Sequence, residues 1–334
     1  MKFINNDVKW GIIGCGNVCE VKSGPAFGKI KGSSLAAVMR RNVNKARDYA
    51  QRHGVPKFYD NAEQLIDDPD INAVYIATPP ASHEEYTIRS LQAGKPVYIE
   101  KPVTVNSQSL GRMIEASHKY DLPVTVAHYR RALPLYQKVR ALIKEGVLGE
   151  IRLVLITLLQ SASSELIAVT DENWRTNPIL SGGGLFHDLS PHQLDILYWL
   201  FGEPKEVKGW SANQGKLYNA PDLAFLEAAY KDNIYFKGVW SFNAAQSASA
   251  DKCEIIGSKG MVSFPFFHNP ILQISTDAGS EAIAFTYPEH IQQPMITEVV
   301  NFFKGDGPNP CSLEEALVSM KMMDTTLIAS SAKQ

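Results

Sequence analysis

The chain has little of what marks several large classes of protein. Its 334 residues include four cysteines, too few for a disulfide-stapled scaffold. No apolar run approaches the ~20 residues of a membrane-spanning helix, and the first residues lack the apolar core of a secretory signal. An excess of either charge is also missing, since 33 Lys+Arg face 35 Asp+Glu, which argues against a nucleic-acid-binding surface. We therefore expect a cytoplasmic protein that binds neither membranes nor nucleic acids.

The chain has an ordinary globular composition, and in its first 127 residues apolar runs of strand length alternate with helical patterns. Residues of the AVILMFWYC set make up 45% of it and charged residues 20%, too apolar for disorder. Apolar runs of strand length cover 8–13, 35–39, 73–77, 97–99 and 124–127. Helical patterns between them cover 43–53, 62–66, 82–93 and 107–119. Such alternation predicts βαβ units around a parallel sheet.

The pattern changes after residue 127. Helical stretches are expected over 135–145 and 186–201, and a long strand over 150–160. Short β-rich segments with hairpin turns, such as Lys231-Asp232-Asn233, fill the region from 207 to 285. This predicts a mostly antiparallel open sheet with helices on one face.

The last part of the chain predicts two helices, over 294–304 and 312–330. The second begins with a capping box, Ser312 to Glu315. We expect two domains, 1–127 and 128–334, with the final helix able to pack back on the first. The fold class is α/β, with a doubly wound parallel sheet followed by an α+β domain.

A glycine turn follows the first strand. Gly14 allows a tight turn, Gly16 lets the backbone approach a pyrophosphate, and Asn17 and Val18 begin a helix whose N-terminus favours that anion. Cys19 stands where the third glycine of G-x-G-x-x-G is usual, so the match is imperfect. Placed first in a series of βαβ units, the turn predicts dinucleotide binding.

Two arginines stand where the second strand ends. In NAD-binding proteins an acidic residue about 20 positions after the glycines accepts hydrogen bonds from the adenosine ribose. This chain has no Asp or Glu between Glu20 and Asp48, and Arg40 and Arg41 occupy the position. Guanidinium groups bind phosphate in bidentate fashion. The residues therefore favour NADP over NAD, although two solvated arginines at a strand end are the plain alternative.

Two further segments carry side chains suited to catalysis. Glu100 and Lys101 follow the fifth strand, at the edge where ligands bind in open α/β sheets. Asp188, His192 and Asp195 are spaced i, i+4, i+7 on the predicted helix 186–201. An aspartate at i−4 can orient the imidazole of a general base. We predict no metal, because the neighbouring histidines lack a ligand set of familiar spacing.

Taken together, these motifs resemble the glucose–fructose oxidoreductase / inositol dehydrogenase family of NAD(P)-dependent oxidoreductases. The resemblance runs through GIIGCGNV, the ATPP…H…AGK…EKP block, the GGG…D-x-x-x-H segment, CEIIGSKGMVSF and the C-terminal SLEEALVSMKM. It implies an N-terminal Rossmann domain and a C-terminal domain for substrate and oligomerisation. It also implies a homodimer or homotetramer, because the open sheet commonly forms the subunit interface.

The resemblance also implies roles for particular residues. Lys101, Asp188 and His192 correspond to the family's catalytic set. The positions that resemble cofactor contacts are the glycine turn, Thr78, Pro79, His83, Glu100, Lys101, Trp174 and Arg175. The expected reaction is hydride transfer between a nicotinamide and a secondary alcohol of a sugar, inositol or related polyol.

Two other functions fit the same sequence. A non-catalytic dinucleotide-binding regulator would not need the intact set of Lys101, Asp188 and His192. An NAD-dependent glycosidase would favour retained NAD, which Arg40 and Arg41 oppose. Substrate contacts stay open, with Tyr129, Arg130, Arg131 and His268 as candidates.

Overall fold

The computed structural model describes residues 1–166 and 173–331, and these form two compact units. The first unit comprises Met1–Leu133 and Tyr287–Leu317, and the second comprises Pro134–Thr286 and the chain from Val318. Among the described residues no helix is long and apolar enough to cross a membrane.

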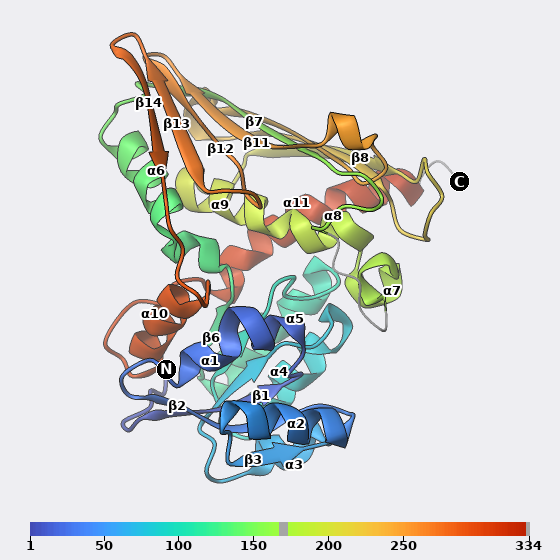
Figure 1. Cartoon of the computed structure of the whole chain (residues 1–334), viewed down its shortest axis with the longest axis vertical. Coiled ribbons are helices and arrows are strands. Elements are labelled where there is room, and N and C mark those ends of the chain that lie inside the picture. The colour runs from blue at the N-terminus through green and yellow to red at the C-terminus, as the bar shows by residue number, and fades with distance from the viewer. Residues whose placement is uncertain (167–172, 332–334) are drawn as a thin grey trace. The chain divides into compact units, whose positions relative to one another are not determined.

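A six-stranded parallel sheet forms the centre of the first unit, in the order β3-β2-β1-β4-β5-β6 (Figure 1). Its strands are β1 (Val8–Ile13), β2 (Ser33–Met39), β3 (Lys57–Tyr59), β4 (Ala73–Ile76), β5 (Val97–Ile99) and β6 (Val124–Val126). The helices of this unit are α1 (Gly24–Phe27), α2 (Val43–His53), α3 (Ala62–Asp67), α4 (His83–Gln92), α5 (Ser107–Tyr120) and α10 (Gln293–Phe303). This order and direction confirm the predicted doubly wound sheet.

Both faces of this sheet are covered. On one face the buried Trp10 of β1 contacts Phe27 of α1 and Phe303 of α10, with ring centroids 4.9 and 5.5 Å apart. On the other face a Cβ on Gly11 would lie 2.6 Å from Leu65 of α3, so only glycine fits there. Helices on both faces explain why the strands read as continuous apolar runs.

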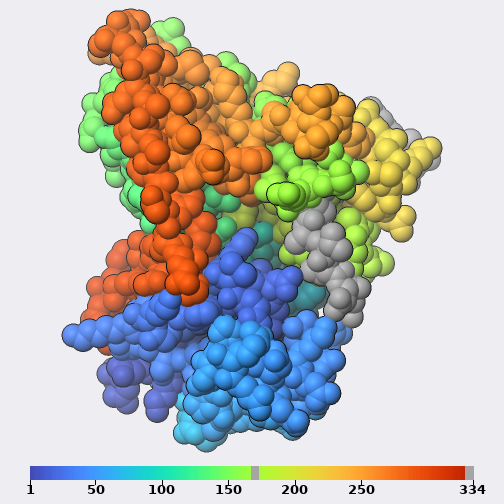
Figure 2. Space-filling view, viewed as in Figure 1, coloured from blue at the N-terminus to red at the C-terminus, as the bar shows by residue number. Residues whose placement is uncertain are grey.

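An eight-stranded mixed sheet forms the second unit, in the order β14-β13-β12-β11-β7-β10-β9-β8. Its strands are β7 (Ile151–Leu159), β8 (Glu206–Ala212), β9 (Leu223–Ala229), β10 (Tyr235–Ser241), β11 (Ala250–Gly257), β12 (Gly260–Phe264), β13 (Ile271–Thr276) and β14 (Gly279–Ala284). Within the part of the chain that the structure describes, β7 and β10 pair in parallel and the other pairs of this sheet are antiparallel, so the sheet is mostly antiparallel as predicted. The β13–β14 hairpin ends the sheet, and β14 is largely exposed (Figure 2).

Helices lie along one face of this second sheet (Figure 1). They are α6 (Pro134–Lys144), α8 (Gly184–Leu189), α9 (Pro191–Phe201) and α11 (Leu313–Ser331), with the short α7 (Pro178–Ser181) nearby. Trp240 of β10 donates from Nε1 to Gln193 of α9 at 2.6 Å. Ser211 of β8 donates to the carbonyl of Thr326 in α11 at 3.0 Å.

The capping box at the start of α11 is present as predicted. The Ser312 amide donates to Glu315 Oε2 at 3.0 Å, and the Glu315 amide donates to Ser312 Oγ at 3.2 Å. Two N-terminal donors that the helix cannot use itself are thereby satisfied.

The predicted helix 186–201 is two helices, α8 and α9. Pro191 lacks the amide hydrogen that would continue α8, although Ser190 before it keeps helical dihedral angles, φ −62° and ψ −29°. The single-helix prediction was wrong because it ignored this proline.

Candidate functional site

The glycine turn lies at the carboxyl end of β1. The amides of Gly14 and Cys15 both donate to the carbonyl of Met39, the last residue of β2, at 2.9 and 3.2 Å. Gly14 has φ +92°, and a Cβ there would lie 2.7 Å from Thr78. A Cβ on Gly16 would meet no atom closer than 3.9 Å. The open space beside the Gly16 backbone is the kind of cradle that a pyrophosphate needs.

The segment after the turn is helical, with Asn17 exposed and Val18 half-buried at its start. It contains a π-helical stretch, Cys19–Ser23, followed by α1. Cys19 is buried, and Tyr49 of α2 donates to its carbonyl at 3.2 Å. Burial raises the pKa of the Cys19 thiol well above its usual value. The cysteine that departs from the G-x-G-x-x-G pattern is therefore a small neutral packing residue here.

Arg40 and Arg41 lie directly after β2, next to this turn. The Arg40 amide donates to the Tyr59 carbonyl at 3.1 Å. Burial raises the pKa of the Cys15 thiol to about 11, and the positive charge of Arg40 lowers this pKa by a smaller amount. The Arg40 guanidinium therefore interacts electrostatically with the glycine turn. The chain then enters α2, which Asn42 caps by accepting from the Lys45 amide at 3.1 Å. A cationic side chain thus lies between a glycine turn and a helix N-terminus.

The nearest acidic side chains along the sequence are engaged elsewhere. Arg52 of α2 pairs with Glu20 at 2.6 Å and with Asp48 at 2.8 Å. His53 also contacts Glu20, at 2.8 Å. The hydrogen bond from Arg52 holds the pKa of Glu20 at about 2. Neither carboxylate is directed to a ribose hydroxyl in this arrangement.

Thr78, Pro79 and His83 follow β4 at the same edge. The Ser82 hydroxyl donates to Thr78 Oγ1 at 2.8 Å. The fully buried His83 places Nε2 2.7 Å from the Thr78 carbonyl and Nδ1 3.2 Å from the Val103 carbonyl. His83 therefore ties the segment after β4 to the segment after β5, which is a positioning task.

The buried His83 makes the stability of the protein depend on pH. Burial lowers the pKa of its imidazole from 6.5 to about 4. The unfolded chain therefore binds this proton more readily than the folded protein does. The contribution of the neutral, buried His83 to stability is present above about pH 6.5 and is lost as pH falls towards 4. A shift of this size corresponds to about 3 kcal/mol. Urea unfolding between pH 7.5 and 5 should show a shallower pH dependence for His83→Asn than for wild type.

The matched control for this measurement is His118→Gln, which alters a histidine that is 68% exposed. Because this ring pairs with Glu314 at 3.0 Å on the surface, where ion pairs contribute little, the substitution should alter unfolding less than His83→Asn does. Equal slopes for wild type and His83→Asn would contradict the assignment.

Glu100 and Lys101 directly follow β5, and other residues of the first unit hold the Glu100 side chain in place. Its Oε1 accepts from Tyr75 at 2.5 Å and from Gln292 at 2.6 Å, and Oε2 accepts from the Lys101 amide at 3.2 Å. Tyr98 completes the network by donating to Gln292 Oε1 at 3.1 Å. Glu100 is 5% exposed. These bonds fix the backbone from which Lys101 projects.

Lys101 is one of several charged side chains of the first unit that interact electrostatically with Tyr129. The buried Tyr129 follows β6, the strand paired with β5. Burial raises the pKa of its phenol, but the charges of Arg130, Lys22 and Lys101 outweigh burial and lower it below 10. Arg131 instead forms a structural ion pair with Glu315 at 2.9 Å. This ion pair gives Arg131 a structural role in the first unit.

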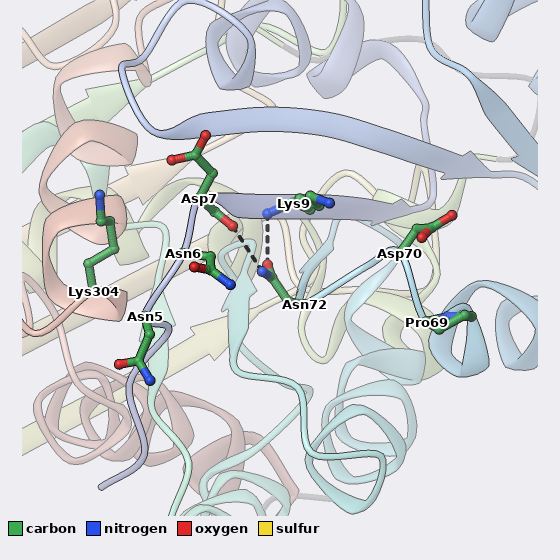
Figure 3. A pocket seen from close by; sticks show the side chains of 8 residues that line it. All are labelled: Asn5, Asn6, Asp7, Lys9, Pro69, Asp70, Asn72 and Lys304. Atoms are coloured by element: carbon green, nitrogen blue, oxygen red, sulfur yellow. Dashed lines mark hydrogen bonds between the residues drawn. The ribbon is translucent and has the colours of Figure 1, made fainter.

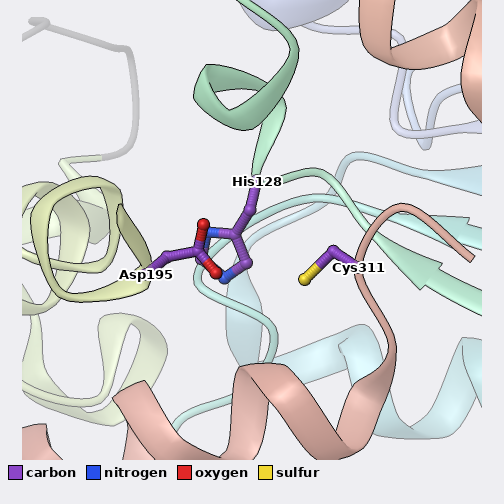
Figure 4. A group of neighbouring side chains, drawn as sticks. All are labelled: His128, Asp195 and Cys311. Carbon is purple, nitrogen blue, oxygen red and sulfur yellow. The ribbon is translucent and has the colours of Figure 1, made fainter. Parts of the chain in front are cut away.

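His128 and Cys311 also belong to the first unit, and both are buried. The Val126 amide donates to the Cys311 carbonyl at 2.9 Å, which joins the end of β6 to the segment before α11. Figure 4 draws these two side chains together with Asp195 of α9. The sequence patterns did not single out His128 or Cys311.

In the second unit, Asp188 lies in the last turn of α8 and His192 in the first turn of α9. Both are buried. Arg175 donates from Nε to Asp188 Oδ2 at 2.9 Å, and its guanidinium stacks on Trp174, 4.5 Å from the ring centroid. Phe267 lies edge-on to His192, with centroids 5.8 Å apart. Arg175, predicted to contact the cofactor, thus pairs with the predicted catalytic aspartate.

A surface pocket of about 670 Å³ lies at the opposite, amino edge of the parallel sheet (Figure 3). It is lined by Asn5, Asn6, Asp7, Lys9, Pro69, Asp70, Asn72 and Lys304. None of the predicted catalytic or cofactor-binding residues is among them. Hydrogen bonds from the Lys9 amide to Asn72, and from Asn72 to the Asp7 carbonyl, account for part of its wall.

Both parts of the chain match known protein families. Residues 8–128 match the model of the oxidoreductase family with an NAD-binding Rossmann fold, and residues 136–263 match the GFO/IDH/MocA C-terminal domain. An oxidoreductase from Formosa agariphila is 45% identical over 317 residues, which cover 95% of this chain and 97% of that one. A trans-1,2-dihydrobenzene-1,2-diol dehydrogenase from Xenopus laevis is 25% identical over 90% of this chain and 85% of its own.

Solved structures share the fold over almost the whole length. The aldose-aldose oxidoreductase from Caulobacter crescentus superposes with a TM-score of 0.84 at 19% identity, covering 98% of this chain and 99% of that one. With a glycine turn able to cradle a pyrophosphate and matches across both parts of the chain, this protein belongs to the GFO/IDH/MocA family of oxidoreductases with an NAD-binding Rossmann fold.

Proposed function

We propose that this chain is a cytoplasmic NADP-dependent dehydrogenase or reductase that interconverts a secondary alcohol and a ketone on a sugar, inositol or related polyol. The observation that carries the proposal is the anchoring of Lys101 at the carboxyl edge of the Rossmann sheet through Glu100. Sugar substrates are supported by solved structures of the same fold, among them the aldose-aldose oxidoreductase.

Three side chains carry the proposed proton chemistry. The bound nicotinamide supplies the hydride-exchanging carbon. Lys101 donates a hydrogen bond to the reacting oxygen and stabilises alkoxide-like charge on it. His192 removes the hydroxyl proton during oxidation and returns it during reduction. Asp188, which pairs with Arg175 at 2.9 Å, is assigned the orientation and polarisation of His192.

The cofactor contacts follow from the residues at the edge of the sheet. The turn of Gly14, Gly16, Asn17 and Val18 receives the pyrophosphate, with backbone amides as donors. Arg40 and Arg41 receive the 2′-phosphate that distinguishes NADP from NAD. The engagement of Glu20 and Asp48 by Arg52 supports this choice.

The direct test is an activity scan with NADP⁺ and NAD⁺ against aldoses, inositols and sugar alcohols, and with NADPH against keto-sugars. We expect nicotinamide reduction or oxidation with at least one member of the panel, at higher kcat/KM for NADP(H). Tight NADPH binding with no turnover on any member would instead support a regulator. Release of nitrophenol from a nitrophenyl glycoside without net cofactor reduction would support a glycosidase.

We further propose that the chain forms a homodimer or homotetramer through the open face of the second sheet. That face carries apolar side chains opposite one another on neighbouring strands, such as Leu153 with Tyr235, and Phe225 with Trp210. Trp210 is 48% and Tyr235 57% exposed. A second copy of the chain would bury these side chains, which favours association.

Light scattering after size exclusion should therefore give a mass of two or four times 36.9 kDa. Leu155→Glu, at the centre of this face, should shift the mass towards one chain, because a carboxylate is costly to bury. Gln108→Glu, at an exposed position of α5 in the first unit, is the matched control and should leave the mass unchanged. A single-chain mass for wild type would contradict the proposal.

A further inference from the structure

One turn of the second unit is held by a single buried carboxylate. Asp251, in the first part of β11, has a side chain that is 1% exposed. Its Oδ1 accepts from the Phe266 amide at 3.0 Å, and its Oδ2 accepts from the amides of Phe267 and His268 at 2.7 and 3.1 Å. His268 Nδ1 adds a fourth contact at 2.9 Å. Three consecutive amides on one carboxylate fix the turn between β12 and β13.

The two aromatic residues of this turn have different neighbours. Phe266 is 2% exposed and lies among Tyr136 and Phe264, at centroid distances of 5.4 and 5.6 Å. Phe267 turns its ring towards His192, edge-on at 5.8 Å with an interplanar angle of 67°. The position of Phe267 is therefore set from two sides, by the carboxylate bonds and by the anchored Phe266.

We infer that Asp251 is a positioning residue for His192 and acts through the ring of Phe267. This inference rests on the proposed role of His192 as the proton-transferring group. A base must lie within hydrogen-bond reach of the proton that it takes, and a displacement of about 1 Å can cost about 100-fold in rate. A buried carboxylate that bonds three amides restrains the turn more firmly than packing of a surface loop does.

Two substitutions separate this role from general stability. Asp251→Asn keeps the shape but replaces one accepting oxygen with an NH₂ group that faces amide donors. Phe267→Leu keeps all the carboxylate bonds and removes the aromatic ring that lies against His192 and Phe266. We expect kcat to fall about 10-fold to 100-fold in both, with KM for the cofactor within about twofold of wild type. Asn269→Ala changes an exposed side chain of the same turn, leaves the three amide bonds, and should change kcat less than twofold.

The ring of His192 provides a readout that does not depend on turnover. The chain has eight histidines, and ¹⁵N-imidazole NMR with a His192→Gln reference assigns the signals of His192. We expect these signals to move in Asp251→Asn and Phe267→Leu, and to stay in place in Asn269→Ala.

Unmoved His192 signals in folded Asp251→Asn and Phe267→Leu proteins would overturn the inference, whatever the activity of the enzyme. Unmoved signals in only one of the two would also overturn it, because both substitutions remove the same restraint. Failure of the proposed function would look different: His192→Gln would retain full turnover while the NMR shifts persist.

Discussion

Replacing His192 with glutamine is expected to lower kcat about 10²–10⁴-fold, the usual contribution of a positioned general acid or base. Glutamine keeps hydrogen-bonding capacity but does not titrate, so the proton of the reacting hydroxyl has no acceptor. Lys101→Met should lower kcat by a similar factor, because the developing oxyanion loses a charged donor. Steady-state kinetics on the substrate found in the scan measures both effects.

Cofactor binding separates a chemical defect from a folding defect in these variants. His192→Gln should bind NADPH as wild type does, measured by fluorescence titration, since the residue acts on the substrate oxygen. His118→Gln changes an exposed histidine of the first unit and should leave kcat unchanged. Full turnover in His192→Gln or Lys101→Met would refute the assigned roles.

Replacing Arg40 with alanine is expected to weaken NADPH binding about 10-fold to 150-fold, while NADH binding stays the same. A hydrogen bond between charged groups contributes about 1.5–3 kcal/mol, and each 1.4 kcal/mol is a factor of about ten. The 2′-phosphate is the one group that NADPH has and NADH lacks, so the loss should be selective. Fluorescence titration with each dinucleotide measures the ratio.

Arg47 offers the matched control for Arg40. It lies on α2, and its guanidinium stacks on Phe58, 5.5 Å from the ring centroid. Arg47→Ala removes an arginine of the same unit away from the glycine turn and should change neither affinity. Equal losses for NADPH and NADH in Arg40→Ala, or no loss in either, would exclude a 2′-phosphate contact.

Most strands of the first unit could be predicted from the sequence because they are buried on both faces and therefore consist of continuous apolar runs. Val8–Ile13, Val97–Ile99 and Val43–His53 begin and end where the apolar runs and caps indicated. The strand Lys57–Tyr59 was missed, because a three-residue edge strand with half-exposed side chains carries no apolar run. β14 was missed for a similar reason, since almost all its residues are exposed.

Some features of the candidate site depend on consecutive residues and could be predicted, whereas others depend on residues that are far apart in the sequence. The glycine turn and Lys101 are visible as short motifs, because their chemistry depends on consecutive residues. The bond from Gln292 to Glu100 joins residues 192 positions apart, and no local pattern predicts it. The ion pair of Arg175 with Asp188 and the turn held by Asp251 also depend on the tertiary fold.

Transfer of deuterium from a substrate carbon to the nicotinamide tests the proposed function most directly. The protein would be incubated with D-glucose or myo-inositol deuterated at every carbinol carbon, and with either NADP⁺ or NAD⁺. The proposal predicts deuterium at C4 of the nicotinamide, faster with NADP⁺, and transfer about 10²–10⁴-fold slower in Lys101→Met. Substrate turnover with no deuterium at C4, or equal rates with both dinucleotides, would contradict it.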